Sequence, residues 1–263
     1  MIIFIKLGGS IITNKDRPMT PKPKVIKRLL GEIKDAVNSY PKYKILLGHG
    51  SGSFGHSAAS FHNTISGVNK QEDWIGFQKV WYAADKLNKI VLDLCEQVKL
   101  PAISFSPCSA GFSSNNKIIQ FNTLPIVQAL YNGIMPIVHG DVIFDETIGA
   151  TIFSTEDIIT QLFEVIHPQR LLLVGKEKGV WQDYPKKQKI FPTINSQNIN
   201  EIKKHLASSE SIDVTGGMGS KVEIMAELIK THKGLTVEIF SGLEEGNLTR
   251  VLNGKRVGTI ITF

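Results

Sequence analysis

The stretch from Lys44 to His56 combines the residue types that an anion-binding turn requires. Its apolar run ends at Leu47, and the chain continues as Gly-His-Gly-Ser-Gly-Ser-Phe-Gly-His. Glycine is needed where the backbone approaches a ligand closely or takes a positive φ, and free backbone N–H groups ahead of a helix bind anions. The stretch therefore predicts a strand that leads into a phosphate-binding loop.

The same loop also matches another class of site. The run from Gly50 to Gly55 has the spacing of the dinucleotide-binding fingerprint, with Glu72 and Asp73 near the place of its ribose-binding acid. Glycine turns elsewhere in the chain weigh against this reading, and pyrophosphate binding gives His56 no role. An oxidoreductase stays open as an alternative, as does an ordinary helix-start role for His56.

An earlier strand leads into a second glycine turn. Residues 2–7 are apolar except for Lys6, they run into Gly8-Gly9-Ser10, and Lys15 follows in the next loop. Ligands of open α/β sheets bind at the carboxyl ends of the strands, so Lys6 is expected to point at a ligand. The alternative is an edge lysine whose stem lies along apolar surface.

Two helix starts complete the set of candidate sites. Asp213-Val214-Thr215-Gly216-Gly217-Met218 precedes Lys221, and Ser154 opens a helix in which Thr155, Glu156 and Asp157 follow. Ser154 or Thr155 is suited to cap that helix, and the helix dipole favours acids in the first turn. Capping is enough to explain the two acids, although the same helix start can also hold an anion.

Apolar strands and amphipathic helices alternate along the chain. Strands are expected at 2–7, 43–47, 101–106, 117–121, 134–138, 170–174, 189–191, 236–240 and 259–263, with a hairpin reaching 151–153. Helices are expected at 24–40, 78–99, 123–131, 154–166, 199–206, 221–231 and 248–252. This alternation predicts a mainly parallel sheet covered by helices, with only a weak domain boundary near 145–170.

Composition excludes several function classes. The chain has 263 residues and a formal charge of +6, but its lysines form no stripe interleaved with aromatics, so nucleic-acid binding is not expected. Cys95 and Cys108 form no metal or disulfide motif, and no apolar run reaches membrane-spanning length. We expect a cytoplasmic protein with no protein-held metal site, and a positive excess suits phosphate ligands.

The three glycine motifs, in this order, resemble the amino acid kinase superfamily, and the Gly-Ser-Gly-Ser-Phe-Gly-His ending resembles its isopentenyl phosphate kinase branch. The likeness extends from Ile2 to Ile261. It implies an α/β fold, an open αβα sandwich with a mainly parallel central sheet, forming one domain over residues 1–263. It further implies an acceptor-binding half at about 1–155, an ATP-binding half at about 156–263, and a homodimer.

The resemblance also implies roles for individual residues. ATP contacts fall on Lys6, Gly8, Gly9, Ser10, Gly52, Gly216, Gly217 and Lys221. Acceptor contacts fall on Ser51, Gly52, Gly55, His56 and Thr155, and Lys15 matches the lysine that stabilises the transition state. Lys6, Lys15, His56 and Lys221 form the expected catalytic set. Mg²⁺ is expected to accompany ATP, held mainly by phosphates and water.

The implied reaction is ATP-dependent phosphorylation of isopentenyl phosphate to the diphosphate, for isoprenoid precursor synthesis by an alternative mevalonate route. A phosphate monoester has a second pKa of about 6, so it needs no general base at neutral pH. His56 then serves as a hydrogen-bond donor to the acceptor phosphate. Alternatives are a phosphonate kinase of the fosfomycin type and a non-catalytic nucleotide-sensing module.

Two further expectations concern the edges of the site. Where the family usually carries Thr-Asp-x-x-Gly-Val, this chain reads Gly-Lys-Glu-Lys-Gly-Val, and Lys176 replaces the aspartate. Charge alone suggests that Lys176 contacts phosphate. Phe77, Val80 and Trp81 are candidates for the wall of an apolar acceptor pocket, with a core or dimer-interface role as the alternative.

Overall fold

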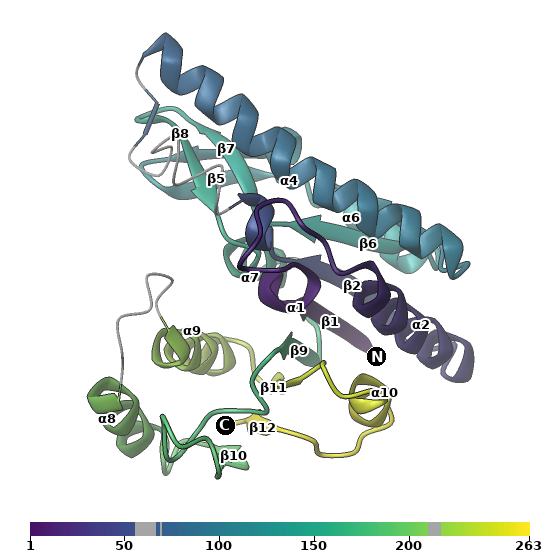
Figure 1. The fold of residues 1–263 in the computed structure, drawn as a ribbon, viewed down its shortest axis with the longest axis vertical. Coiled ribbons are helices and arrows are strands. Elements are labelled where there is room, and N and C mark those ends of the chain that lie inside the picture. The colour runs from purple at the N-terminus through teal and green to yellow at the C-terminus, as the bar shows by residue number, and fades with distance from the viewer. Residues whose placement is uncertain (56–66, 69, 210–216) are drawn as a thin grey trace.

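A computed structural model of the chain describes residues 1–55, 67–68, 70–209 and 217–263 (Figure 1). His56 and Gly216, both named above, lie outside these residues. The main sheet has the strand order β10-β12-β11-β9-β1-β2-β6-β3, and every neighbouring pair is parallel except β11 and β12. The strands are β1 (Ile2–Leu7), β2 (Lys44–His49), β3 (Ala102–Ser104), β6 (Met135–His139), β9 (Arg170–Gly175), β10 (Thr193–Ile194), β11 (Thr236–Ser241) and β12 (Thr259–Ile261).

The central strand β1 is buried on both faces. Phe4 belongs to one apolar cluster, whereas Ile3 and Ile5 belong to another, because successive side chains of a strand point to opposite faces. All three side chains are fully buried. A continuous apolar run is what a strand with helices on both faces requires, so the expectation for residues 2–7 is confirmed.

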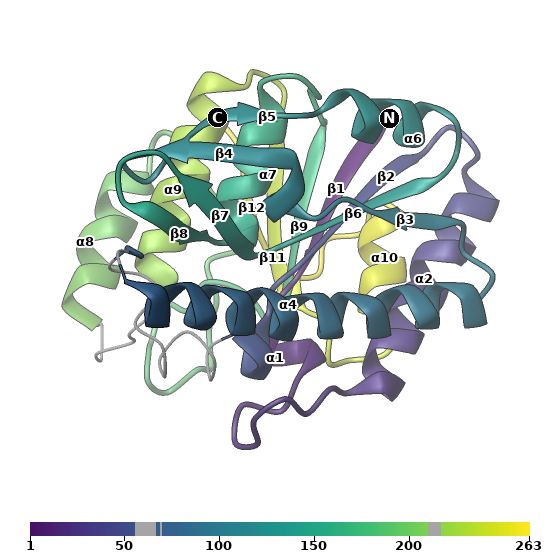
Figure 2. The same cartoon turned by 90° about the horizontal axis from the view of Figure 1, so that it is seen from above.

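Helices cover both faces of the sheet and complete a three-layer sandwich (Figure 2). One cluster joins the sheet to α1 (Gly9–Ile12), α2 (Pro23–Ser39), α4 (Gln71–Gln97) and α10 (Asn247–Leu252). The other joins it to α6 (Leu124–Tyr131), α7 (Thr155–Phe163), α8 (Ile199–Ser209) and α9 (Gly217–Thr231). The predicted αβα sandwich is confirmed. Within the described residues, none of the helices is both long and apolar enough to span a membrane.

A second sheet, in the order β5-β4-β7-β8, departs from the expected alternation. It comprises β4 (Gly111–Ser114), β5 (Lys117–Phe121), β7 (Asp141–Asp145) and β8 (Gly149–Phe153), and β4 follows the short helix α5 (Pro107–Ala110). The expected hairpin is present as the antiparallel pair β7 and β8. The first half of α4 lies along this sheet (Figure 2). Apolar side chains of the sheet pack against that half of the helix.

Two expected element positions are wrong. The long helix α4 begins at Gln71 rather than at 78, because the Asp73 carboxylate accepts a hydrogen bond from the Lys70 backbone N–H and caps a polar first turn. The strand expected at 189–191 is replaced by β10. The Asp183 carboxylate accepts hydrogen bonds from the backbone N–H groups of Gln188 and Lys189, which closes a turn there. The strand therefore begins only after this turn, at Thr193.

Candidate functional site

The two amino-terminal glycine loops leave the sheet side by side. The Gly8 N–H donates to the Val174 carbonyl at 2.8 Å, and the Gly50 N–H donates to the Leu7 carbonyl at 3.0 Å, so hydrogen bonds link the loops directly to neighbouring strand ends. A Cβ atom on Gly9 would lie 2.5 Å from the Gly52 Cα atom. Only glycine permits that approach, so the two loops lie in direct backbone contact.

Thr13 ties these loops together and was missed by the sequence reasoning. Its hydroxyl donates to the Gly9 carbonyl at 2.7 Å and accepts from the Ser53 N–H at 3.0 Å. Gly52, with φ of 52°, leaves room for this side chain, since a Cβ there would lie 2.2 Å from Thr13 Oγ1. A lone threonine in a polar loop gives no sequence signal for such a bridge.

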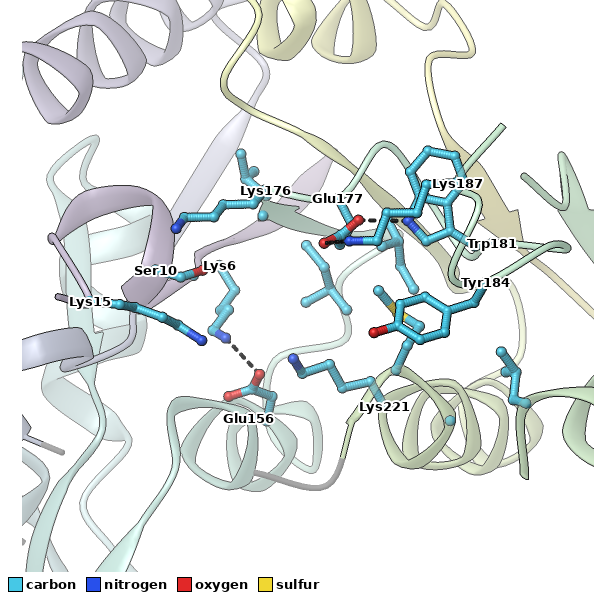
Figure 3. A pocket seen from close by; sticks show the side chains of 18 residues that line it. Lys6, Ser10, Lys15, Glu156, Lys176, Glu177, Trp181, Tyr184, Lys187 and Lys221 are labelled. Atoms are coloured by element: carbon cyan, nitrogen blue, oxygen red, sulfur yellow. Dashed lines mark hydrogen bonds and ion pairs between the residues drawn. The ribbon is translucent and has the colours of Figure 1, made fainter. Parts of the chain in front are cut away.

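A cavity of about 320 Å³ opens at the carboxyl ends of β1 and β9. Lys6, Lys15, Lys176 and Lys221 all line it, although they come from different parts of the sequence. Figure 3 shows the amines of Lys6, Lys15 and Lys221 pointing toward one region beside Glu156. The structure thus brings the sequence-predicted Lys6, Lys15 and Lys221 to one cleft. Gly8 and Ser10 lie in its wall.

Glu156 has a contact that sequence reasoning did not anticipate. Ser154 and Asp157 form the capping box of α7, whereas the Glu156 carboxylate lies 2.6 Å from the Lys6 amine. Burial by itself raises the pKa of this carboxyl, but the charges of Lys6 and Lys221 and the hydrogen bond from Lys6 hold it below its ordinary value. Glu156 therefore stays ionised between two lysines from opposite halves of the chain.

Aromatic residues form the carboxyl-terminal wall of the cavity. Trp181 and Tyr184 line it, and the Trp181 indole N–H donates to the Glu177 carboxylate at 2.6 Å. Lys187 pairs with the same carboxylate at 2.8 Å, which anchors the segment over the cavity (Figure 3). Sequence reasoning gave none of these residues a role in the site, because no glycine motif or helical periodicity marks them.

Thr155 is placed beside the acceptor-side loop, but its hydroxyl is already bonded. The side chain is 2% exposed and donates to the His49 carbonyl at 2.8 Å. With its hydroxyl hydrogen engaged in this way, Thr155 has its backbone N–H as a further donor at the start of α7. Ser51, Gly52 and Gly55 belong to the glycine loop as expected, and a Cβ on Gly55 would lie 2.1 Å from Ser51 Oγ.

A pair of buried histidines lies at the carboxyl ends of the paired strands β2 and β6. The His49 and His139 rings stack with centroids 5.4 Å apart, and His49 Nε2 lies 3.2 Å from Asn88 Oδ1. Burial, followed by the charge of His139, lowers the pKa of His49 to about 3. Asp141 lies close by, and burial raises its pKa to about 7. Both histidines are therefore neutral at physiological pH.

The three pocket candidates belong to one apolar cluster between α4 and the second sheet. Phe77 and Val80 are buried with Val142, and Trp81 packs against them. The ring of Phe144 lies 4.8 Å from that of Phe77.

Among the described residues, no group of three or more His, Cys, Asp and Glu side chains is arranged to hold a metal ion.

Comparisons with known proteins agree with this geometry. The sequence profile of the amino acid kinase family matches residues 1–241. The isopentenyl phosphate kinase of Methanocaldococcus jannaschii is 31% identical over 272 residues, which cover 100% of this chain and 99% of that protein. The isopentenyl phosphate kinase of Methanothermobacter thermautotrophicus is 30% identical and covers 99% of each. A solved structure of isopentenyl phosphate kinase superposes with a TM-score of 0.78 at 27% identity, covering 100% of both chains.

Proposed function

Because this chain belongs to the amino acid kinase family, we propose that it transfers the γ-phosphoryl group of ATP to isopentenyl phosphate and forms isopentenyl diphosphate. The observation that carries the proposal is the convergence of Lys6, Lys15 and Lys221 on one cavity beside two glycine loops. The relatives that match nearly the whole chain are named for the same acceptor, which supports this choice over a phosphonate acceptor.

The chemistry needs positioning and positive charge more than covalent help. An oxygen of the acceptor phosphate attacks the γ-phosphorus, the bond to the β–γ bridging oxygen breaks, and ADP leaves with the electron pair. The three lysine amines balance the charge that develops on the transferred group. When bound with ATP, Mg²⁺ would neutralise phosphate charge; the carboxylate of Glu156 is already paired with Lys6, so phosphates and water supply most metal ligands.

The two substrates are assigned to opposite halves of one domain. ATP lies over residues 156–263, with its phosphates at Gly8, Gly9, Ser10, Gly52, Gly216, Gly217, Lys6 and Lys221. The acceptor phosphate lies over residues 1–155, at Ser51, Gly52, Gly55, His56 and the backbone of Thr155. The contact between Gly9 and Gly52 supports a short path between the two phosphates. His56 enters on its sequence position alone.

The apolar cluster beside α4 is proposed to hold the acceptor's hydrocarbon tail. Phe77 and Val80 pack with Val142 in one buried cluster between α4 and the second sheet. Burying a five-carbon tail there is favourable by about 0.8 kcal/mol for each CH₂ group. Trp81 forms the half-buried edge of the same cluster.

Steady-state kinetics with two acceptors test the proposed function. Purified protein with ATP and Mg²⁺ is offered isopentenyl phosphate or a phosphonate such as fosfomycin, and ADP release and the phosphorylated product are both measured. We expect isopentenyl diphosphate as the main product. Turnover of the phosphonate alone would favour the phosphonate kinase, and nucleotide binding without turnover would favour a sensing module.

Location and assembly belong to the same proposal. We propose a cytoplasmic homodimer that supplies isoprenoid precursor synthesis through an alternative mevalonate route. Exposed apolar side chains support a protein partner surface, since Ile119 is 57% and Leu124 is 73% exposed within three residues of the β5–α6 turn. Light scattering on the purified protein measures the assembly, and a monomer across the concentration range would refute it.

A further inference from the structure

We propose that Lys176 is a further phosphate-binding residue, which holds the terminal phosphates of the nucleotide together with Lys15. This inference rests on the proposed kinase function and adds a residue to it. In this chain, a lysine stands where the family pattern has an aspartate, so the nucleotide would meet a fourth cation in the cleft.

The backbone places Lys176 beside the first glycine turn. Leu7 pairs with Val174 in the parallel ladder, and the Gly8 N–H donates to the Val174 carbonyl. A Cβ atom on Gly8 would lie 3.3 Å from that carbonyl oxygen and 3.8 Å from Gly175 Cα. Lys176 therefore emerges from the sheet next to the turn that is expected to hold the nucleotide phosphates.

The side chain lies along the wall of the cavity. Figure 3 shows the Lys176 amine directed toward the side of the cavity where Ser10 and Lys15 lie. Burial lowers the pKa of Lys176, and the nearby positive charges of Lys22 and Lys15 lower it further. The turn after β9 thus places Lys176 within electrostatic reach of two lysines from the loop between α1 and α2.

Carboxylates do not balance this group of cations. Glu177, the nearest acid in sequence, bonds to Trp181 and Lys187, and its charge raises the pKa of Lys176 less than the charges of Lys22 and Lys15 lower it. Asp16 acts on Lys176 in the opposite direction to Lys22 and Lys15, but more weakly than either. Lys176 forms no salt bridge within the part of the chain that the structure describes. An anion with several charges would relieve the repulsion among the lysines.

A neighbouring lysine provides a matched control. Lys178 stands two positions further along the same turn, but its amine pairs with Glu244 at 3.5 Å and its side chain is 66% exposed. It does not line the cavity. Replacing Lys178 removes the same formal charge from the same loop, so any difference between the two variants reports on position and not on net charge.

Calorimetric titration separates a phosphate contact from a general loss of binding. We expect Lys176→Met to weaken binding of a non-hydrolysable ATP analogue by about tenfold and to leave AMP binding nearly unchanged, as for a lost charge-assisted hydrogen bond. Lys178→Met should match the wild type for both ligands. Lys176→Arg should recover most of the affinity, and its thermal melting should match that of the wild type.

The outcomes are distinct from those of the kinase test. Unchanged affinity of Lys176→Met for the analogue, or equal weakening for the analogue and AMP, overturns the assignment of Lys176. If the wild type binds the analogue more tightly than Lys176→Met does, but forms no isopentenyl diphosphate, the contact stands and the proposed function is overturned. A wild-type protein that does not bind the analogue overturns both.

Discussion

The Lys6 amine lies 2.6 Å from the Glu156 carboxylate, and the two side chains are 13% and 18% exposed. Lys6 comes from the central strand β1, and Glu156 comes from the first turn of α7. The same carboxylate also interacts with the charge of Lys221 in α9. A single acid therefore pairs with a lysine of the amino-terminal half and lies within electrostatic reach of a lysine of the carboxyl-terminal half.

Glu156→Gln should lower kcat by about a hundredfold, since misplacing preorganised charge costs that much in other enzymes. KM for ATP should not rise, because the change removes a negative charge from a phosphate site. Steady-state kinetics measure both. Asp157→Asn is the control. It weakens the capping box that Asp157 forms with Ser154, so it should cost about 1 kcal/mol of unfolding free energy and leave kcat unchanged. Equal kcat for the wild type and Glu156→Gln would contradict the role.

Gly9→Ala should separate the two glycine loops, because its Cβ would lie 2.5 Å from the backbone of Gly52. A shift of about 1 Å in reacting groups costs about a hundredfold in rate, so kcat should fall at least that far. Gly31→Ala, inside α2 with nothing within 4 Å of the new Cβ, should instead stabilise the fold by about 0.5–1 kcal/mol. Near-normal turnover of Gly9→Ala would show that loop contact is dispensable.

His56→Ala should abolish use of the acceptor while leaving nucleotide binding intact, because His56 is proposed to donate a hydrogen bond to the acceptor phosphate. Kinetics with isopentenyl phosphate, combined with calorimetry on an ATP analogue, separate the two effects. His167→Ala is a suitable control, since that histidine lies beside His232 and away from the glycine loops. A His56→Ala protein with near-normal activity would rule out the contact.

Enlarging the apolar cluster should widen the range of acceptors. Phe77→Ala combined with Val80→Ala removes buried side chains beside Val142, and longer prenyl phosphates should then become substrates. Tyr82→Ala, on the same helix but 55% exposed, should not change the preference. Product analysis with prenyl phosphates of increasing length is the measurement. If the double variant still rejects every longer acceptor, the tail does not lie in this cluster.

The pH dependence of stability should reveal the buried groups below the acceptor loop. The His49 pKa is about 3 in the folded protein and about 6.5 when unfolded, so the unfolded chain takes up a proton first and stability falls as pH drops below about 6.5. Asp141 has the opposite effect. Its folded pKa of about 7 lies above its unfolded value, so the folded protein binds this proton first and its stability rises as the pH falls below about 7. Asp85, Cys108 and His139 also interact electrostatically within this group.

Asp141→Asn should therefore expose the effect of the histidines. Urea unfolding at about pH 7 and at about pH 5 should show a larger loss of unfolding free energy in this variant than in the wild type. Asp93→Asn, on an exposed part of α4 with a 59% exposed side chain, should keep the wild-type difference. Parallel pH profiles for the wild type and Asp141→Asn would contradict the opposing titrations.

The sequence predicted those parts of the site that local backbone geometry requires. A close backbone approach requires glycine, and a buried strand requires a run of apolar residues, so both leave a local signal in the sequence. The loops around Gly9 and Gly52 were predicted from that signal. Lys6 and Lys221 were found because they adjoin such loops. Glu156 was not, because an acid in a first helical turn satisfies the helix dipole whether or not it also meets a distant lysine.

The second sheet and the aromatic wall show the same limit. The alternation of strands and helices does not reveal that β4 and β5 join β7 and β8 rather than the main sheet. Lys187 meets Glu177 across a turn that the Asp183 carboxylate closes by accepting from the Gln188 N–H. Contacts of this kind depend on tertiary packing, which residue spacing does not encode.

The bond from Gly8 to Val174 and the bond from Gly50 to Leu7 carry the sheet's hydrogen bonding into both glycine loops. Adjacent strands of a sheet stand about 4.8 Å apart, a spacing set by the backbone and not by side chains. The separation between the two glycine loops is thus set by the backbone ladder. Substitutions in the apolar cluster beside α4 or in the aromatic wall can therefore change those surfaces while the two loops keep their distance.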